Sequence, residues 1–137
     1  MEGLIVEKAG LLDTIQDQGR SGFQASGIVV SGAMDSFSYQ IGNILVGNKP
    51  TSPALEITLV GPRLYFSQPT YIAITGANLS PMLNGQTIPM WQAVAVREGD
   101  ILTFGRAVAG CRSYLASMED LMYLTYFKAA PLMSKEK

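Results

Sequence analysis

The sequence predicts a mainly β protein that carries one short helix. Three observations favour this fold class: strand candidates follow one another at short spacing, turns that contain glycine or proline separate them, and only one segment has helical periodicity. Closely spaced strands are typical of a β-barrel or β-sandwich and argue against a βαβ sheet. At 137 residues the chain is long enough for one domain with its own core.

Strand candidates occur along most of the chain. Residues 55–66 alternate in their first part and break at Gly61-Pro62, which predicts two strands joined by a turn. A further strand is predicted to end at Gly76, where residues 75–78 form either its exit, the favoured interpretation, or a turn that lines a ligand. The other strand candidates are Leu4–Glu7, Thr14–Asp17, Tyr71–Thr75, Trp91–Val96, Ile101–Phe104 and Arg112–Ala116.

Asn84-Gly85 is the strongest local signal in the sequence. Both residues tolerate the positive φ angles of a type I′ turn, so Leu83–Gln86 is predicted to form a hairpin with a two-residue loop. Arg97–Asp100 is predicted to form a second turn between two strands.

Residues 35–46 form the single helix candidate. Asp35 suits the N-cap position and Gly47-Asn48 suits the C-terminal end. Gly42 lowers the helix propensity by up to about 1 kcal/mol relative to alanine. The helix is expected to pack on the barrel, and its apolar residues at helical spacing are Phe37, Ile41, Ile44 and Leu45.

Composition and charge argue against several classes of function. Ten basic and eleven acidic residues give a net charge of −1, which predicts no surface for nucleic acid or an anionic membrane. The longest apolar runs fall far short of the roughly 20 residues that span a bilayer. The first residues, MEGLIVEKAG, have no basic region and no long apolar stretch, so we do not expect them to act as a secretory signal. A single cysteine, Cys111, cannot form an internal disulfide, which fits a cytoplasmic protein.

The chain contains no histidine, which rules out Ser-His-Asp and Cys-His nucleophile systems within it, as well as imidazole ligands for zinc. No carboxylate spacing predicts a metal site, and the consensus of the phosphate-binding loop is absent. Chemistry on this chain would therefore use carboxylates, arginine, hydroxyls and backbone amides, or reactive groups from a partner.

A first candidate site lies in the segment QDQGRSG, where Gln16, Asp17 and Arg20 surround Gly19. Glycine lets the backbone approach a ligand closely, and arginine binds carboxylate or phosphate through two hydrogen bonds. Asp17 would orient Arg20 or act as a base on an amide substrate. A tight turn with a structural Asp–Arg pair remains the alternative.

A second candidate site is the segment SGAMD at residues 31–35. Ser31, the Gly32 amide and Asp35 precede the predicted helix, and the free amides of a helix N-terminus attract anions. Ser31 and the amides are better substrate ligands than Asp35, for which a plain N-cap is the alternative.

Further residues carry weaker functional hypotheses. Arg112 would reach a ligand or a partner protein, whereas Cys111 is expected to be a small buried residue. Glu56 is expected to face outward from its strand, and Trp91 to belong to the core or an interface.

Several stretches, in the same order and at the same spacing over about 115 residues, together resemble the allophanate hydrolase subunit 2 family. This family includes the C subunit of 5-oxoprolinase, the carboxyltransferase part of urea carboxylase and an antagonist of a sporulation-kinase inhibitor. The matching stretches are GLLDTIQDQGRSGFQASGI at 10–28, SGAMDSFSYQIGNILVGN at 31–48, ALEITLVGPRLYF at 54–66, AITGANLSPMLNGQTIPMWQAVAVREGDILTFG at 73–105 and GCRSYLA at 110–116.

The resemblance implies a cyclophilin-like β-barrel, of which this chain would hold the N-terminal part. It also implies a heteromer with relatives of the A and B subunits of 5-oxoprolinase, acting on a small cyclic amide. The expected reaction is the ATP-dependent hydrolysis of 5-oxoproline to L-glutamate, with ATP bound at a site shared with a partner. The alternatives are a regulatory module that antagonises a B-subunit-like inhibitor of a histidine kinase, and the carboxyltransferase part of a urea carboxylase-like system.

The resemblance ends near Ala116, so residues 1–116 are interpreted as the family domain and 117–137 as an aberrant tail. The family continues with a glycine-rich stretch like GGFDVPxVLGSRSTY, whereas this chain reads SMEDLMYLTY. Back-translated and read two nucleotides later, residues 118–137 can encode GGFDVPHVLQSRSTYVKGK. The triplet GTA that overlaps Met122-Tyr123 must then encode the family's valine. We therefore interpret the tail as the product of a frameshift.

Sequencing the gene across codons 110–137 and beyond tests the frameshift. We expect an open frame, offset from the translated one, that encodes the missing half of the family protein. Downstream bases that encode nothing of the kind would contradict the frameshift and would favour the regulatory module.

Overall fold

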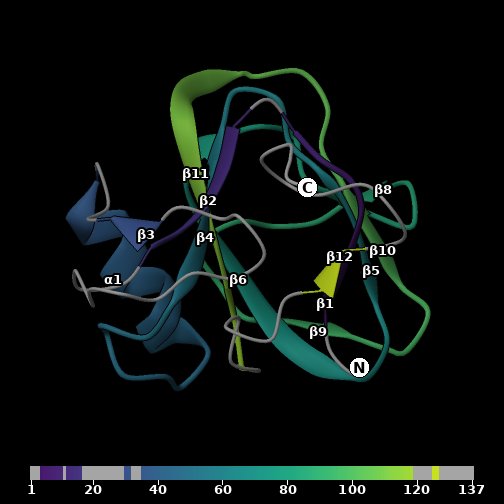
Figure 1. Cartoon of the computed structure of the whole chain (residues 1–137), viewed down its shortest axis with the longest axis horizontal. Helices are drawn as coiled ribbons and strands as arrows, with labels where there is room; N and C mark the ends of the chain where they lie inside the picture. Colours follow the sequence, from purple (N-terminus) through teal and green to yellow (C-terminus); the bar gives the residue numbers. More distant parts are fainter. Residues whose placement is uncertain (1–3, 11, 17–29, 32–34, 119–124, 127–137) are drawn as a thin grey trace.

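The computed structural model describes residues 4–10, 12–16, 30–31, 35–118 and 125–126, and these residues form two sheets and one helix (Figure 1). One sheet has the strand order β12-β1-β5-β10-β7-β8, and the other has the order β3-β2-β4-β11-β6-β9. We call them sheet A and sheet B. The elements are β1 Leu4–Lys8, β2 Leu12–Gln16, β3 Val30–Ser31, α1 Ser36–Leu45, β4 Ala54–Thr58, β5 Arg63–Phe66, β6 Thr70–Asn78, β7 Met82–Leu83, β8 Gln86–Thr87, β9 Val94–Val96, β10 Ile101–Thr103, β11 Ala109–Ser117 and β12 Thr125–Tyr126.

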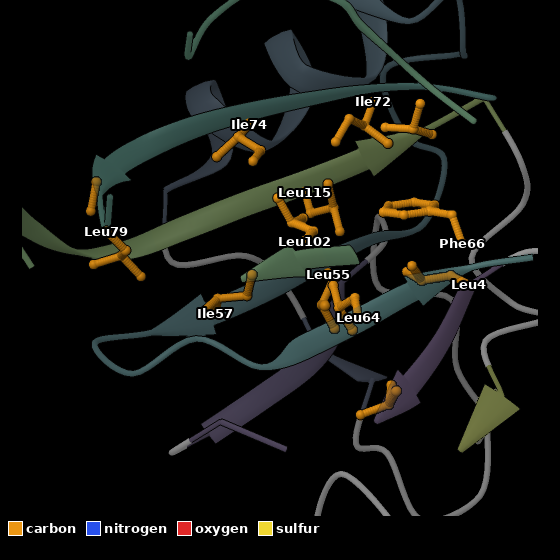
Figure 2. Packing of buried hydrophobic residues seen from close by; sticks show 13 residues of the cluster. Leu4, Leu55, Ile57, Leu64, Phe66, Ile72, Ile74, Leu79, Leu102 and Leu115 are labelled. Atoms are coloured by element: carbon orange, nitrogen blue, oxygen red, sulfur yellow. The ribbon is translucent and has the colours of Figure 1, made fainter. Parts of the chain in front are cut away.

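The hydrophobic core lies between the two sheets. Sheet B contributes Leu55 and Leu115, which are fully buried, and sheet A contributes Leu64 and Leu102, whose side chains meet them (Figure 2). Phe66 closes one end of this cluster. Because side chains alternate along a strand, β6 and β11 give one face to this core and turn the other face toward α1.

The face of sheet B that meets α1 is polar and small. Glu56, Tyr114 and Thr75 lie opposite one another on β4, β11 and β6, and all three are buried. Above them α1 presents Ser38 and Gly42, and a Cβ added at Gly42 would lie 3.2 Å from the Thr75 hydroxyl. Hydrogen bonds and close backbone approach therefore help to hold α1 on the sheet, together with the buried Tyr39 side chain, which belongs to the same cluster as Ala54 and Tyr114.

Two apolar residues of α1 point away from the sheet, whereas Leu45 packs against the buried cluster that contains Ala73 and Ala116. Phe37 is 68% exposed and Ile44 is 50% exposed, whereas Asn43 in between is fully buried. The Asn43 amide donates hydrogen bonds to the Pro50 and Ser52 carbonyl groups, which fixes the loop that follows the helix.

A wide bulge interrupts the pairing of β11 with β6. Ala109 pairs with Asn78 and Ser113 with Gly76, so β11 has more residues than β6 between the same two pairs. Gly76 has φ +84° and Gly110 has φ +77°, which are backbone conformations that favour glycine. The bulge separates the 110–112 segment from β6 beside the start of α1, while Arg112 remains paired with Thr58 of β4.

The predicted fold class of a mainly β chain with one short helix is confirmed. Asp35 caps the helix and Gly47, at φ +85°, follows it, as predicted. Within the described residues the strands pair as two separate sheets, and likeness to cyclophilin stays a prediction. No helix in the described part of the chain is long and apolar enough to cross a bilayer.

The hairpin and turn predictions are confirmed as well. Asn84 and Gly85 have φ of 52° and 83° between the paired residues Leu83 and Gln86. Several strand boundaries are wrong, among them the start of β11, which begins at Ala109 and not at Arg112. The strand predicted to end at Gly76 continues to Asn78 because the bulge opposite accommodates the glycine, and β9 begins only at Val94 because Trp91 has φ 62°.

The bulge yields a stability prediction. Gly76→Ala places a Cβ 2.7 Å from the Arg112 carbonyl oxygen, in addition to the strain of a positive φ, and should destabilise the fold by about 2–4 kcal/mol. Gly85→Ala is the matched control, because its φ is nearly the same and no atom lies within 4 Å of the added Cβ, and it should cost about 1–2 kcal/mol. Urea unfolding of both variants measures the difference, and equal losses would contradict the clash.

Candidate functional site

A hollow of about 540 Å³ lies between the start of α1 and the bulge of β11. One wall is the helix end, the opposite wall is the bulge, and the floor is β6. Its described lining residues are Asp35, Ser38, Gly76, Ala77, Trp91, Ala109, Gly110, Cys111 and Arg112. Gly76 in the floor and Gly110 in the bulge wall carry no side chain, so a ligand could approach the backbone closely at these two positions.

Asp35 supplies the negative charge of this hollow. Its carboxylate accepts hydrogen bonds from the Ser38 hydroxyl at 2.6 Å and from the Ser38 backbone amide at 3.1 Å. These two hydrogen bonds hold the pKa of the Asp35 carboxyl below its ordinary value. Asp35 therefore remains an anionic acceptor at neutral pH and is a poor base.

A buried hydrogen-bond chain fixes the backbone of Asp35. The Tyr114 hydroxyl accepts the Asp35 N–H at 2.9 Å and donates to the Glu56 carboxylate at 2.5 Å. Burial, followed by the hydrogen bond to Glu56, raises the pKa of Tyr114 above its ordinary value, so the phenol keeps the proton that it donates. The Thr75 hydroxyl adds a 2.7 Å hydrogen bond to the Ser38 carbonyl group.

Arg112 supplies the positive charge. Its Nη1 lies 3.6 Å from Cys111 Sγ, a weak contact, and the only ion pair among the described residues joins Arg63 to Glu7 instead. Within the part of the chain that the structure describes, Arg112 and Asp35 thus share one hollow without neutralising each other. Such a guanidinium keeps its donors available for a carboxylate or phosphate group.

Trp91 separates this hollow from a second one of about 490 Å³. Its positive φ is stabilised by a 2.8 Å hydrogen bond from its backbone N–H to the Ile74 carbonyl group. The ring is 42% exposed and lies 6.5 Å, centroid to centroid, from the ring of Phe37. The second hollow is lined largely by apolar side chains, among them Met82, Ile88 and Met90.

The family described as "Carboxyltransferase domain, subdomain A and B" matches residues 26–130, which is more than half of the chain. The chain belongs to this carboxyltransferase-domain family. The match covers α1, Trp91 and the bulge of β11, and thus all of the described residues that line the hollow.

Curated relatives are much longer than this chain. It is 43% identical to the urea amidolyase of Saccharomyces cerevisiae over 107 residues, which are 77% of this chain and 6% of the relative. It is 40% identical to the C subunit of the Escherichia coli 5-oxoprolinase over 113 residues, which are 82% of this chain and 36% of the relative. The crystal structure of the K. lactis urea amidolyase superposes with a TM-score of 0.74 at 42% identity, over 84% of this chain and 7% of that one.

Two of the predicted site residues meet in this carboxyltransferase-domain fold. Asp35 and Arg112, 77 positions apart in the sequence, line the same hollow. Gln16 and Ser31 lie opposite each other where the parallel strands β2 and β3 pair. Asp17, Gly19, Arg20 and Gly32 lie outside the described residues, so their predicted roles stay predictions.

Three expectations about single residues are wrong. Glu56, expected to face outward, is only 7% exposed, and its carboxylate accepts a hydrogen bond from the buried Tyr114 hydroxyl. Cys111, expected to be buried, is exposed and lies in the bulge, where β11 is not paired with β6. Gly76, interpreted as part of a strand exit, lies within β6 and lines the hollow.

Sequence reasoning missed Tyr114 altogether. Tyr114 lies two residues after Arg112 on a predicted strand, so both residues share one face of the sheet. This spacing was the feature of the sequence that could have placed Tyr114 near the site.

The described lining residues do not fit a nucleoside triphosphate. Arg112 is the only cation among them, and the Asp35 carboxylate already accepts the Ser38 amide at the start of α1, where a phosphate would otherwise bind. The carboxylate would also repel phosphate oxygens. Among the described residues, no three His, Cys, Asp or Glu side chains are placed to hold a metal ion.

The cap at Asp35 predicts a pH-dependent contribution to stability. Because folding lowers the Asp35 pKa, the contribution is present above the unfolded pKa of about 3.9 and is lost as pH falls through the lower folded pKa. Asp35→Ala should therefore lower the free energy of unfolding by about 1 kcal/mol near neutral pH, and the gap to the original chain should shrink below about pH 3. Asp35→Asn, which keeps an N-cap oxygen, is the control and should lose much less. A gap for Asp35→Ala that urea unfolding finds unchanged between about pH 7 and 2.5 would contradict this role.

Proposed function

We propose that this chain is part of a protein like the C subunit of 5-oxoprolinase and that the hollow beside α1 binds 5-oxoproline. The observation that carries the proposal is the pair of opposite charges, Asp35 and Arg112, held apart in one hollow. The identity to the C subunit of the Escherichia coli 5-oxoprolinase supports it independently.

The chemistry of 5-oxoproline matches these groups one by one. Its carboxylate would accept two hydrogen bonds from the Arg112 guanidinium, in the planar geometry that arginine offers. Its lactam N–H would donate to the Asp35 carboxylate, which the hydrogen bonds from Ser38 keep anionic. The apolar ring carbons would pack against Trp91, and the backbone at Gly76 lets the small ring sit deep in the hollow.

The complete protein, together with partners like the A and B subunits of 5-oxoprolinase, would hydrolyse 5-oxoproline to L-glutamate with ATP in the cytoplasm. Since the described lining residues do not fit a triphosphate, we propose that a partner supplies most of the nucleotide site. This chain would then contribute substrate binding, and we expect it to be catalytically inactive without its partners. Turnover of 5-oxoproline by the isolated chain would contradict that expectation.

Carboxyl transfer to a urea-like substrate is the second candidate, favoured by the 43% identity to a urea amidolyase. Urea has no carboxylate, so it would use Asp35 as an acceptor and make no use of the Arg112 charge. The two candidates therefore differ in how strongly ligand binding depends on Arg112.

We expect Arg112→Lys to weaken 5-oxoproline binding about ten-fold, because lysine cannot form the paired hydrogen bonds of a guanidinium. Arg106→Lys is the matched control: Arg106 is exposed, does not line the hollow, and its replacement should leave the affinity unchanged. Isothermal titration calorimetry of the full chain with 5-oxoproline, and with urea, measures both affinities.

Three results discriminate between the candidates. Binding of 5-oxoproline that depends on Arg112 supports the oxoprolinase proposal. Binding of urea alone, unaffected by Arg112→Lys, favours the carboxyltransferase. Equal effects of Arg112→Lys and Arg106→Lys on 5-oxoproline would overturn the assignment of Arg112.

A further inference from the structure

We infer that Tyr114 is the positioning residue of this site: its hydroxyl sets the distance between Asp35 on α1 and Arg112 on β11. The inference deepens the proposed function, because it names the residue on which the geometry of the 5-oxoproline site depends. It rests on three observations about the described residues, namely the hydrogen bonds of the hydroxyl, the burial of the ring and the place of Tyr114 along β11.

The hydroxyl is used in both directions. It donates a hydrogen bond to the Glu56 carboxylate at 2.5 Å and accepts a hydrogen bond from the Asp35 backbone N–H at 2.9 Å. A chain N–H···O–H···O in a buried setting strengthens each of its bonds, because each polarises the next. The order of the chain requires the phenol to be protonated, since a phenolate has no proton to give to Glu56.

Because of the position of Tyr114 on β11, its hydrogen bond to the Asp35 N–H acts as a spacer between Asp35 and Arg112. Tyr114 follows Arg112 by two residues on β11. A short stretch of the same strand therefore connects the residue whose hydroxyl binds Asp35 to Arg112, the cation of the hollow. Glu56 lies directly opposite Tyr114 on β4 and holds the hydroxyl from the far side. The Tyr114 ring is fully buried, so the hydroxyl has little freedom to move.

The other contacts of α1 do not fix the same point. Thr75 binds the Ser38 carbonyl group, which is farther along the helix. The Asp35 carboxylate binds Ser38, which belongs to the same helix, so this contact does not place the helix on the sheet. Among the contacts of the described residues, only the bond to Tyr114 ties Asp35 itself to the strand that carries Arg112.

Tyr39→Phe is the matched control for Tyr114→Phe. Tyr39 is also buried, belongs to the same cluster and donates its hydroxyl to the Ser52 carbonyl group at 2.8 Å, away from the hollow. Both substitutions remove one buried hydroxyl and keep the ring, but Tyr114→Phe also takes the donor from the buried Glu56 carboxylate and should cost more stability. Binding and exchange are therefore compared under conditions in which both variants are folded. Only Tyr114→Phe removes the acceptor of the Asp35 N–H.

Three readouts separate positioning from general stability. We expect Tyr114→Phe to weaken 5-oxoproline binding about ten-fold and to speed hydrogen exchange of the Asp35 amide about ten-fold, with neither effect in Tyr39→Phe. Trp91, the one tryptophan of the chain, lines the hollow and contacts Phe37 of α1. Its quenching by acrylamide should therefore increase in Tyr114→Phe alone.

Glu56→Gln provides the conservative rescue, because the glutamine side-chain oxygen still accepts the Tyr114 proton. We expect this variant to bind 5-oxoproline within about three-fold of the original chain. A ten-fold loss of 5-oxoproline affinity in Glu56→Gln, with unchanged hydrogen exchange of the Asp35 amide, would assign the effect to the charge of the Glu56 carboxylate. That result would overturn the role of Tyr114.

The outcomes separate this inference from the proposed function. If the original chain fails to bind 5-oxoproline, the proposed function fails, while Asp35 exchange and Trp91 quenching still decide the role of Tyr114. If Tyr114→Phe folds and matches Tyr39→Phe in exchange and quenching, the inference is overturned. Should Tyr114→Phe not fold, the original chain still tests the inference. A nuclear Overhauser effect between the Asp35 amide and the Tyr114 ring protons beside the hydroxyl would support the spacer role. Absence of this effect would overturn it.

Discussion

The hydrogen bond between the Tyr114 hydroxyl and Glu56 is the interaction on which the arrangement of helix and sheet depends. A carboxylate on the covered face of a sheet is costly unless a donor meets it, and the phenol is that donor. The same oxygen then accepts the Asp35 N–H, so the group that satisfies the buried charge also fixes where α1 begins. This polar contact acts beside apolar packing on the same face, where Tyr39 of α1 belongs to a buried cluster with Ala54 and Tyr114.

The second constraint is the bulge that separates β11 from β6 between Ala109 and Ser113. Regular pairing with β6 would place the 110–112 segment against β6, where the floor of the hollow now lies. Gly76 and Gly110 permit the bulge because both have positive φ, and an added Cβ would lie 2.7 Å from the Arg112 oxygen and 2.9 Å from the Ala77 Cβ, respectively. The site is thus a product of backbone geometry, and this geometry sets the position of Arg112.

The sequence predicts those features that depend on local chemistry. Asn84-Gly85 specifies its turn through φ, and Asp35 specifies the helix start through a side-chain acceptor, so both predictions are confirmed. Features that depend on pairing across the sheet are beyond local patterns. Gly76 lies within a strand because the neighbouring strand bulges opposite it, and Cys111 is exposed in that bulge. Glu56 is buried beside Tyr114 of the neighbouring strand, although the alternation of its own strand indicates an outward side chain.

The charges of the hollow show why a polar ligand fits this geometry better than an internal ion pair. Asp35 is held by the Ser38 hydroxyl and amide and by its own backbone bond to Tyr114, so it cannot swing toward Arg112 without losing its cap. Arg112 is carried by a bulge that glycine conformations fix in place. Because separate constraints hold the two opposite charges apart, a molecule bound between them can interact favourably with both. A ligand with an acceptor at one end and a donor at the other completes both sets of hydrogen bonds, and the backbone pays no new ordering entropy when it binds.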